Sequence, residues 1–217
     1  MTDRVYYPDI EQGSPEWFAL KAGKFSGSRF KVLMSKTASG KPTAGRANLL
    51  ADLAIERITG IYTETYCSAA MQRGIEREPE ILAAYEDHNL LCVDTIGFIQ
   101  HAELPFIGVS PDALVGDGGM AQYKFRSASD QHLKCVLHNH HATEYKYQLQ
   151  GEMWIAQRDW SDVVSYDPRF PDGVRLAIAR VERDTELIEE LKAECIKANK
   201  DVDAIVEQLN EKIRKAA

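Results

Sequence analysis

Three polar side chains near the middle of the chain have types and spacing that suit a divalent cation. Asp112 follows Pro111, and Gln122 and Lys124 lie two positions apart after a Gly-rich turn. The apolar residues on both sides of that turn predict a β-hairpin closed by an Asp-Gly turn. Side chains alternate along a strand, so Gln122 and Lys124 share one face, and Asp112 on the neighbouring strand would meet them. A carboxylate, an amide and an ammonium group around one point could bind a metal ion and transfer a proton.

This hairpin resembles the PD-(D/E)xK nuclease signature, in which an Asp after Pro is followed by an acidic residue two positions before a Lys. Here the signature is Pro111-Asp112 and then Gln122-Tyr123-Lys124. Alone it is weak, because such short fragments recur by chance. The resemblance narrows to the lambda exonuclease branch, the YqaJ-type viral recombinases, because further pieces follow in order and spacing between residues 17 and 168. Those pieces are EWFALKAGKFSGS, RGIEREPE, GVSPDAL, YQLQGEMW and SYDP.

The resemblance implies a fold and an activity. The fold would be α/β with a restriction-endonuclease-like core, a central mixed β-sheet flanked by helices. The activity would be a phage-type 5′→3′ exonuclease that hydrolyses one strand of duplex DNA from a 5′-phosphorylated end, for recombination by single-strand annealing. Implied partners are double-stranded DNA ends, the resulting single strand, an annealing protein and further copies of the chain in a homotrimer. The expected location is the bacterial cytoplasm, for a phage- or prophage-encoded protein.

The resemblance also assigns metal and catalytic residues. The implied cofactor is Mg²⁺, with Mn²⁺ as a substitute; Mg²⁺ prefers oxygen ligands, commonly one or two carboxylates with waters and substrate phosphate. Such an ion activates water and stabilises the leaving oxygen of a phosphodiester. The matching positions are Glu78, Asp112, Gln122 and the Tyr123 carbonyl for the ions, and Lys124 to orient or deprotonate the attacking water. Glu76 and Glu80 compete with Glu78, but neither fits the family spacing.

A second set of residues would hold the terminal 5′-phosphate. The family uses a basic residue, two Ser and a Gln, and the matching positions are Lys21, Ser28, Ser110 and Gln150. The best-known member of the family has Arg at the position of Lys21; Lys provides a point charge but no bidentate fork. Without the resemblance, Lys21 would be a solvated residue near a helix end and Ser28 a helix-cap serine.

Gln122 departs from the family pattern, which has Glu at this position. Gln keeps nearly the same shape but loses the charge, and its NH₂ donor cannot coordinate a cation. The sequence therefore predicts weakened metal binding and little or no cleavage. A Glu→Gln exchange of this kind is typical of an engineered inactive variant. A natural degenerate homologue and an unusual active site are the alternatives.

Composition and charge set wider bounds. The 217 residues suit one domain over 1–217, with a C-terminal helical segment over 184–215. Apolar runs are too short for a membrane span, and residues 1–13 lack a signal-peptide core. The cysteines at 67, 92, 135 and 195 are scattered, which indicates a reducing compartment. Their spacing also argues against a zinc site or an iron–sulfur cluster. The net charge of −7 comes largely from the C-terminal part, so DNA is expected at the basic residues between 21 and 46.

Periodicity and punctuation predict the remaining elements. Residues 35–45 read as a flexible loop without the phosphate-loop motif, and the His-rich segment at 138–141 as a loop near DNA. In the helix from 143 onwards, Gln150 is expected to look into the site. Strands are predicted over 90–100, 161–166 and 174–181, and helices over 14–23, 46–58, 68–88, 129–137 and 184–215.

Two other functions compete with the exonuclease. Gln122 makes a DNA-end binding module without catalysis credible, and the same fold could carry a structure-specific or site-specific endonuclease. Linear and covalently closed duplexes distinguish an exonuclease from an endonuclease, because a closed circle offers no end.

Overall fold

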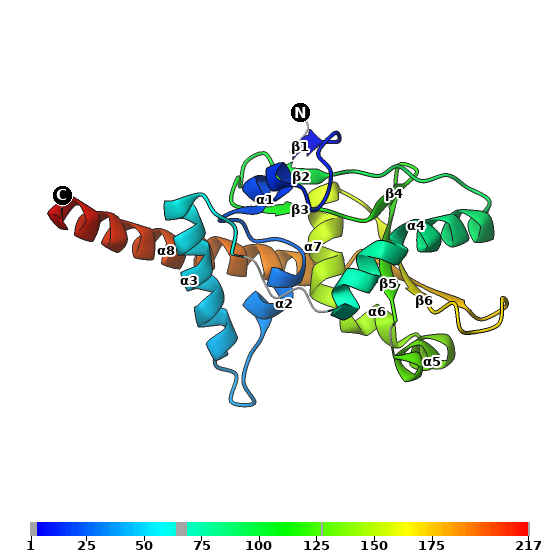
Figure 1. Ribbon diagram of the computed structural model, residues 1–217. Helices are drawn as coiled ribbons and strands as arrows, with labels where there is room; N and C mark the ends of the chain where they lie inside the picture. Colours follow the sequence, from blue (N-terminus) through cyan, green and yellow to red (C-terminus); the bar gives the residue numbers. More distant parts are fainter. Residues whose placement is uncertain (1–3, 64–68, 127, 217) are drawn as a thin grey trace.

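The computed structural model (Figure 1) describes residues 4–63, 69–126 and 128–216 and has a mixed α/β architecture. The strands are β1 (Arg4–Tyr7), β2 (Phe98–His101), β3 (Gly108–Val109), β4 (Ala113–Val115), β5 (Gly119–Phe125), β6 (Trp160–Tyr166) and β7 (Leu176–Glu182). The helices are α1 (Pro15–Lys21), α2 (Ser28–Met34), α3 (Ala44–Thr59), α4 (Ala69–Asn89), α5 (Ser129–His138), α6 (His140–Glu144), α7 (Lys146–Ala156) and α8 (Thr185–Ala216).

The strands form two sheets. The smaller sheet is antiparallel in the order β1-β2-β3, and the larger has the order β4-β5-β6-β7. In the larger sheet β5 runs antiparallel to β4 and parallel to β6, while β7 is antiparallel to β6. The predicted hairpin is therefore β4–β5, and its turn includes Gly116 at φ +53°, a conformation that glycine adopts readily. The expected mixed sheet flanked by helices is confirmed.

Helices cover both faces of the larger sheet, and alternation along the strands decides which residues meet which helix. Tyr123 of β5 and Val164 of β6 join a core cluster with Tyr85 of α4. Met120 and Val163, one position out of phase, join the larger cluster to which α7 contributes Leu149 and Met153. Gln122 and Lys124 have the same phase as Met120 and so point towards α7.

Several helix boundaries follow the sequence signals. Ser14 accepts a hydrogen bond from the Trp17 backbone N–H and caps α1, and Gly60 ends α3 at φ +70°. Proline inside a helix removes one backbone hydrogen bond, and α4 nevertheless continues through Pro79.

The strand predicted over 90–100 is wrong for most of its length, because β2 begins at Phe98; Asp94 only forms an isolated bridge to Leu114. The strand β1 was not predicted. The expected His-rich loop is also wrong: residues 140–144 form α6, and His141 is fully buried.

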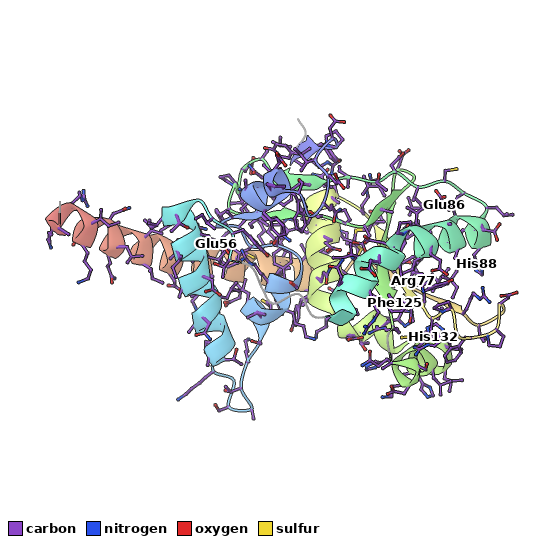
Figure 2. All side chains as sticks on the ribbon, in the orientation of Figure 1. Glu56, Arg77, Glu86, His88, Phe125 and His132 are labelled. Atoms are coloured by element: carbon purple, nitrogen blue, oxygen red, sulfur yellow. The ribbon has the colours of Figure 1, made fainter. Side chains whose placement is uncertain are left out.

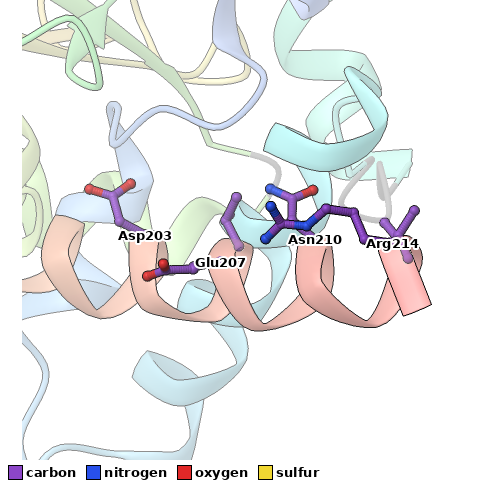
Figure 3. Close-up of a pocket in the computed structure, with 6 residues that line it drawn as sticks. Asp203, Glu207, Asn210 and Arg214 are labelled. Atoms are coloured by element: carbon purple, nitrogen blue, oxygen red, sulfur yellow. The ribbon is translucent and has the colours of Figure 1, made fainter. Parts of the chain in front are cut away.

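The C-terminal helix α8 packs on α2, α3 and α7 along its first half and extends past α3 in its second half (Figure 1). Its buried positions run from Ile188 to Val202, and Ile213 near its end is exposed. A shallow hollow of about 420 Å³ lies along this outer part, between Asp203 and Arg214 (Figure 3). The hollow is lined by α8 alone and holds none of the predicted site residues.

Cys92, Cys135 and Cys195 are free thiols, and Cys67 lies outside the described residues. Within 4–63, 69–126 and 128–216, no helix combines the length and the apolar character needed to cross a bilayer.

Candidate active site

The hairpin brings Asp112 and Gln122 into direct contact, as their spacing predicted. The Gln122 side-chain amide donates a short hydrogen bond to Asp112 Oδ2, and the Tyr123 backbone N–H donates to the same oxygen at 2.6 Å. Burial raises the pKa of Asp112, and the nearby Lys124 ammonium opposes the shift. A Glu at 122 has no N–H to give, so it would set two carboxylates against each other and require a cation between them. In this chain the N–H of the Gln122 amide takes the place of such a cation beside Asp112.

The helix α7 reaches this cluster through Gln148. Its Nε2 donates to Gln122 Oε1 at 3.3 Å and to Glu152 Oε1 at 2.9 Å. Glu152 is 1% exposed. Burial raises its pKa to about 8, although the hydrogen bond from Gln148 acts in the other direction.

Gln150, which was expected to face the site, lies elsewhere. Its Nε2 donates to the Glu182 carbonyl and its Oε1 accepts from the Asp184 N–H, each at 2.8 Å, so the amide ties α7 to the end of β7 and to the residue before α8. The physical reason is helical geometry: residues four apart share a face, whereas residues two apart point in different directions. The Gln that looks into the site is therefore Gln148.

Glu78 approaches Asp112 from α4. Both line a cleft of about 540 Å³ together with Tyr123, Ile96 and residues 8–12. Burial, and then repulsion from Asp112, raises the pKa of Glu78 to about 7.

The acidic neighbours of Glu78 have other partners. Glu80 accepts from the Tyr166 hydroxyl at 2.7 Å and pairs with Arg77, and Glu76 accepts from Gln72. Among these three acids, Glu78 is the one that the structure places beside Asp112.

The predicted phosphate residues Lys21 and Ser110 contact the same indole ring, Lys21 over its face and Ser110 at its N–H. Lys21 Nζ stands 3.6 Å from the Trp17 ring centre, and Trp17 Nε1 donates to Ser110 Oγ at 2.8 Å. The ring of Tyr62 is 5.3 Å from the same ammonium. Burial, and then repulsion from Arg29, lowers the pKa of Lys21 to about 7. Trp17 is thus the residue that joins α1 to the Ser-Pro-Asp segment.

Ser28 and Lys124 complete the predicted set. Ser28 is the first residue of α2 and is exposed, while Gly27 holds the cap position, so the helix-cap alternative for Ser28 is wrong. Lys124 is half-buried, with Nζ 5.0 Å from the Tyr145 ring centre. A Cβ on Gly27 would come within 4.0 Å of Glu152 Oε1, so the start of α2 and the middle of α7 are neighbours.

The residues fit a divalent cation only in part. Over the ranges that the structure describes, no group of three or more His, Cys, Asp or Glu side chains lies close enough together to hold a metal ion. Mg²⁺ needs only one or two carboxylates when waters and substrate phosphate fill its other positions. Asp112, with Glu78 across the cleft, satisfies that requirement in chemistry, and the Gln122 amide opposes it.

Sequence reasoning missed Gln148, Glu152 and Trp17. The signal for the first two was present: Gln148 and Glu152 are four apart, and Glu152 is the one ionisable residue in the run 149–156. An acid inside a helical run with no other charged residue requires an explanation, because an unpaired carboxylate is rarely buried.

A mixed sheet with a helix on each face, and a hairpin that carries Asp112 beside residue 122 and Lys124, is the arrangement of a class of metal-dependent nucleases, although this chain has Gln122 where that class has an acid. The match to known families is consistent with that class. Residues 16–159 match the model of the YqaJ-like viral recombinase domain, and the chain belongs to this family.

Solved structures agree with the family assignment. An alkaline exonuclease from Laribacter hongkongensis is 36% identical, with a TM-score of 0.85 over 94% of this chain and 100% of its own. The same enzyme in complex with dAMP gives a TM-score of 0.84 at 36% identity, with the same shares of the two chains covered. A phage-related exonuclease from Haemophilus somnus 129PT is 18% identical, with a TM-score of 0.70 over 86% of this chain and 96% of its own, and shares the fold. No curated protein sequence matches the chain.

Proposed function

We propose that this protein is a 5′→3′ exonuclease that hydrolyses one strand of duplex DNA from a 5′-phosphorylated end with the help of Mg²⁺ or Mn²⁺. The observation that carries the proposal is the position of Asp112 beside residue 122 and, across a cleft, Glu78, on the hairpin of a fold shared with an alkaline exonuclease that has been solved with dAMP. The proposed setting is phage recombination in a bacterial cytoplasm, with a single-strand annealing protein as partner and a homotrimer as the working form.

The hairpin residues take the chemical roles. Asp112, residue 122 and the Tyr123 carbonyl would hold the ion, with Glu78 across the cleft for a second one. A bound divalent ion supplies water activation and stabilisation of the leaving oxygen. Lys124, on the same strand face as residue 122, orients the attacking water or accepts its proton.

The residues around Trp17 recognise the DNA end. Lys21 and Ser110 both contact the indole, and an ammonium group with a lowered pKa regains its charge beside a phosphate, because opposite charge favours the protonated form. Ser28 adds a hydroxyl at the start of α2. Gln148 replaces Gln150 in this proposal, because both polar atoms of the Gln150 amide are bonded to the backbone of Glu182 and Asp184.

Gln122 decides whether the chain as written cleaves. If residue 122 is the sole source of the second negative charge, the Gln122–Asp112 hydrogen bond competes with the ion, and the chain is an inactive variant that still binds DNA ends. That binding module is the second candidate function, and the hydrogen bond is the observation that favours it.

The test uses duplexes labelled at either end and digested by the Gln122→Glu protein, with and without Mg²⁺. We expect metal-dependent release of nucleotides from the 5′-phosphorylated end and none from a covalently closed circle. A matched Gln122→Glu/Asp112→Asn protein should be inactive. Cutting of the closed circle would indicate an endonuclease, and no cleavage under any condition would contradict the proposal.

A further inference from the structure

Glu152 stands at the end of a chain of hydrogen bonds that starts at Asp112. Asp112 accepts from Gln122, Gln122 accepts from Gln148, and Gln148 also donates to Glu152. The second oxygen of Glu152, Oε2, is shielded from solvent and has no hydrogen-bond partner among the residues that the structure describes. We call it the open oxygen. One hydrogen bond from a neutral amide is little compensation for burying a carboxyl group.

The packing of α7 against the sheet explains how a residue of the helix can take the role of residue 122 on strand β5. Gln122 and Lys124 point from β5 towards α7, and Gln148 and Glu152 occupy the face of α7 that receives them. A carboxylate at 122 would enter this space from the strand. Glu152 enters the same space from the helix.

The charges around Glu152 belong to the same cluster. Asp112 and Lys124 act on its carboxyl group most strongly, and Lys21 acts on it less. Glu152 thus lies near the hairpin residues Asp112 and Lys124 and within reach of the charge of Lys21. Its neighbour Gly27 leaves open space, because an added Cβ would only just touch Oε1.

We propose that Glu152 supplies the second negative charge for the divalent cation, in place of the Glu that the family pattern has at position 122. The inference rests on the proposed function and deepens it: the acid has moved from strand β5 to helix α7, and the open oxygen is the atom that faces the ion or one of its waters. Asp112 remains the first carboxylate. The chain as written then binds the metal and cleaves DNA.

The main experiment measures Mn²⁺ binding by titration calorimetry, in the absence of DNA, for the unaltered chain and for Glu152→Gln. Loss of a group that supports a metal typically lowers affinity by about 10–100-fold, and we expect a fall of that order. The control is Glu194→Gln, which removes the same charge from α8, where Glu194 pairs with Arg46. We expect the control to bind Mn²⁺ like the unaltered chain.

A second pair of variants keeps the test valid if Glu152→Gln alone is poorly folded. Gln122→Glu in the unaltered chain and Gln122→Glu/Glu152→Gln restore the family arrangement with and without the helix acid. If the acid has moved, the double variant recovers the Mn²⁺ affinity and the cleavage that Glu152→Gln loses. Equal Mn²⁺ affinity of Glu152→Gln and the unaltered chain would overturn the inference.

Cleavage assays separate this inference from the proposed function. If the unaltered chain is inactive, Gln122→Glu is active and Glu152→Gln leaves Mn²⁺ binding unchanged, the exonuclease stands and the role of Glu152 falls. If no variant cleaves DNA, including Gln122→Glu, the proposed function falls, and the calorimetry alone decides whether Glu152 supports a metal.

Discussion

Glu56 and Glu152 are each 1% exposed, but the regions around them treat the two carboxylates in opposite ways. Glu56 of α3 accepts a pair of hydrogen bonds from the Arg29 guanidinium, one from the Gly23 N–H at 2.7 Å and one from the Thr63 N–H at 2.9 Å. Glu152 accepts only from Gln148 among the residues described here. Figure 2 labels Glu56 on α3, on the opposite side of the molecule from Arg77 of α4.

The pKa values express the same difference. Burial by itself raises the pKa of Glu56, but the hydrogen bonds from Arg29 and Gly23 outweigh it, and the pKa lies below its usual value. At Glu152 burial prevails and the pKa rises to about 8. A buried acid with four donors fixes the junction of α1, α2 and α3. A buried acid with one donor destabilises the folded chain, so its presence points to function.

The largest expected effect is that of Glu56→Gln, measured by urea unfolding. Removing one partner of a buried ion pair leaves the Arg29 charge uncompensated and typically destabilises by about 3–5 kcal/mol. The control Glu194→Gln, at a partly exposed pair, should stay within roughly 0.5 kcal/mol of the unaltered chain. A loss at Glu56 no larger than that of the control would remove the contrast between the two regions.

Arg29→Lys should have the next largest effect. Lys retains the charge but cannot make the paired hydrogen bonds to Glu56, and a hydrogen bond to a charged group contributes about 1.5–3 kcal/mol. The measurement is the same unfolding experiment. A stability equal to that of the parent would mean that charge alone, without geometry, holds this junction.

Glu152→Gln should have a smaller effect of the opposite sign, a gain of about 1 kcal/mol at pH 8, because a neutral amide is less costly to bury. The raised pKa sets the pH window. The pKa of Glu152 is about 4.5 in the unfolded chain and about 8 in the folded chain. Its protonated form therefore contributes fully to the free energy of unfolding below about pH 4.5, and this contribution is lost as the pH rises through about 8. The advantage of Glu152→Gln in metal-free unfolding should therefore grow between pH 5 and pH 8. Glu56 should show the reverse trend, losing its contribution as the pH falls below about 4.5.

The smallest effect concerns Lys21. The cations of the two regions differ as the acids do, because Arg29 has Glu56 as its partner whereas Lys21 faces aromatic rings. Its pKa of about 7 predicts that the preference for a 5′-phosphorylated over an unphosphorylated duplex is greater at pH 6 than at pH 8.5. We expect a difference of about fivefold, equivalent to roughly 1 kcal/mol for one added ion pair. Lys21→Met should abolish this pH dependence in metal-free binding assays. A preference that does not change with pH would contradict it.

Local signals in the sequence predicted much of the fold. Ser14 and Gly60 marked helix ends, and the Gly-rich turn at 116–119 marked the hairpin that carries Asp112 and Gln122. The division into two sheets was not predictable, because it depends on pairing between β1 and β2, which are far apart in the chain. The orientation of α7 likewise depends on packing, so the sequence predicts Gln150 at the site where the structure has Gln148.

The central strand of the larger sheet has a consequence for the history of this site. Gln122 lies on β5, which is hydrogen-bonded to β4 on one edge and to β6 on the other, so its register cannot slip without breaking both ladders. Such a scaffold tolerates exchange of single side chains while the backbone keeps its shape. A lineage could therefore gain or lose an acid on either neighbouring element by point substitution, with no change in architecture.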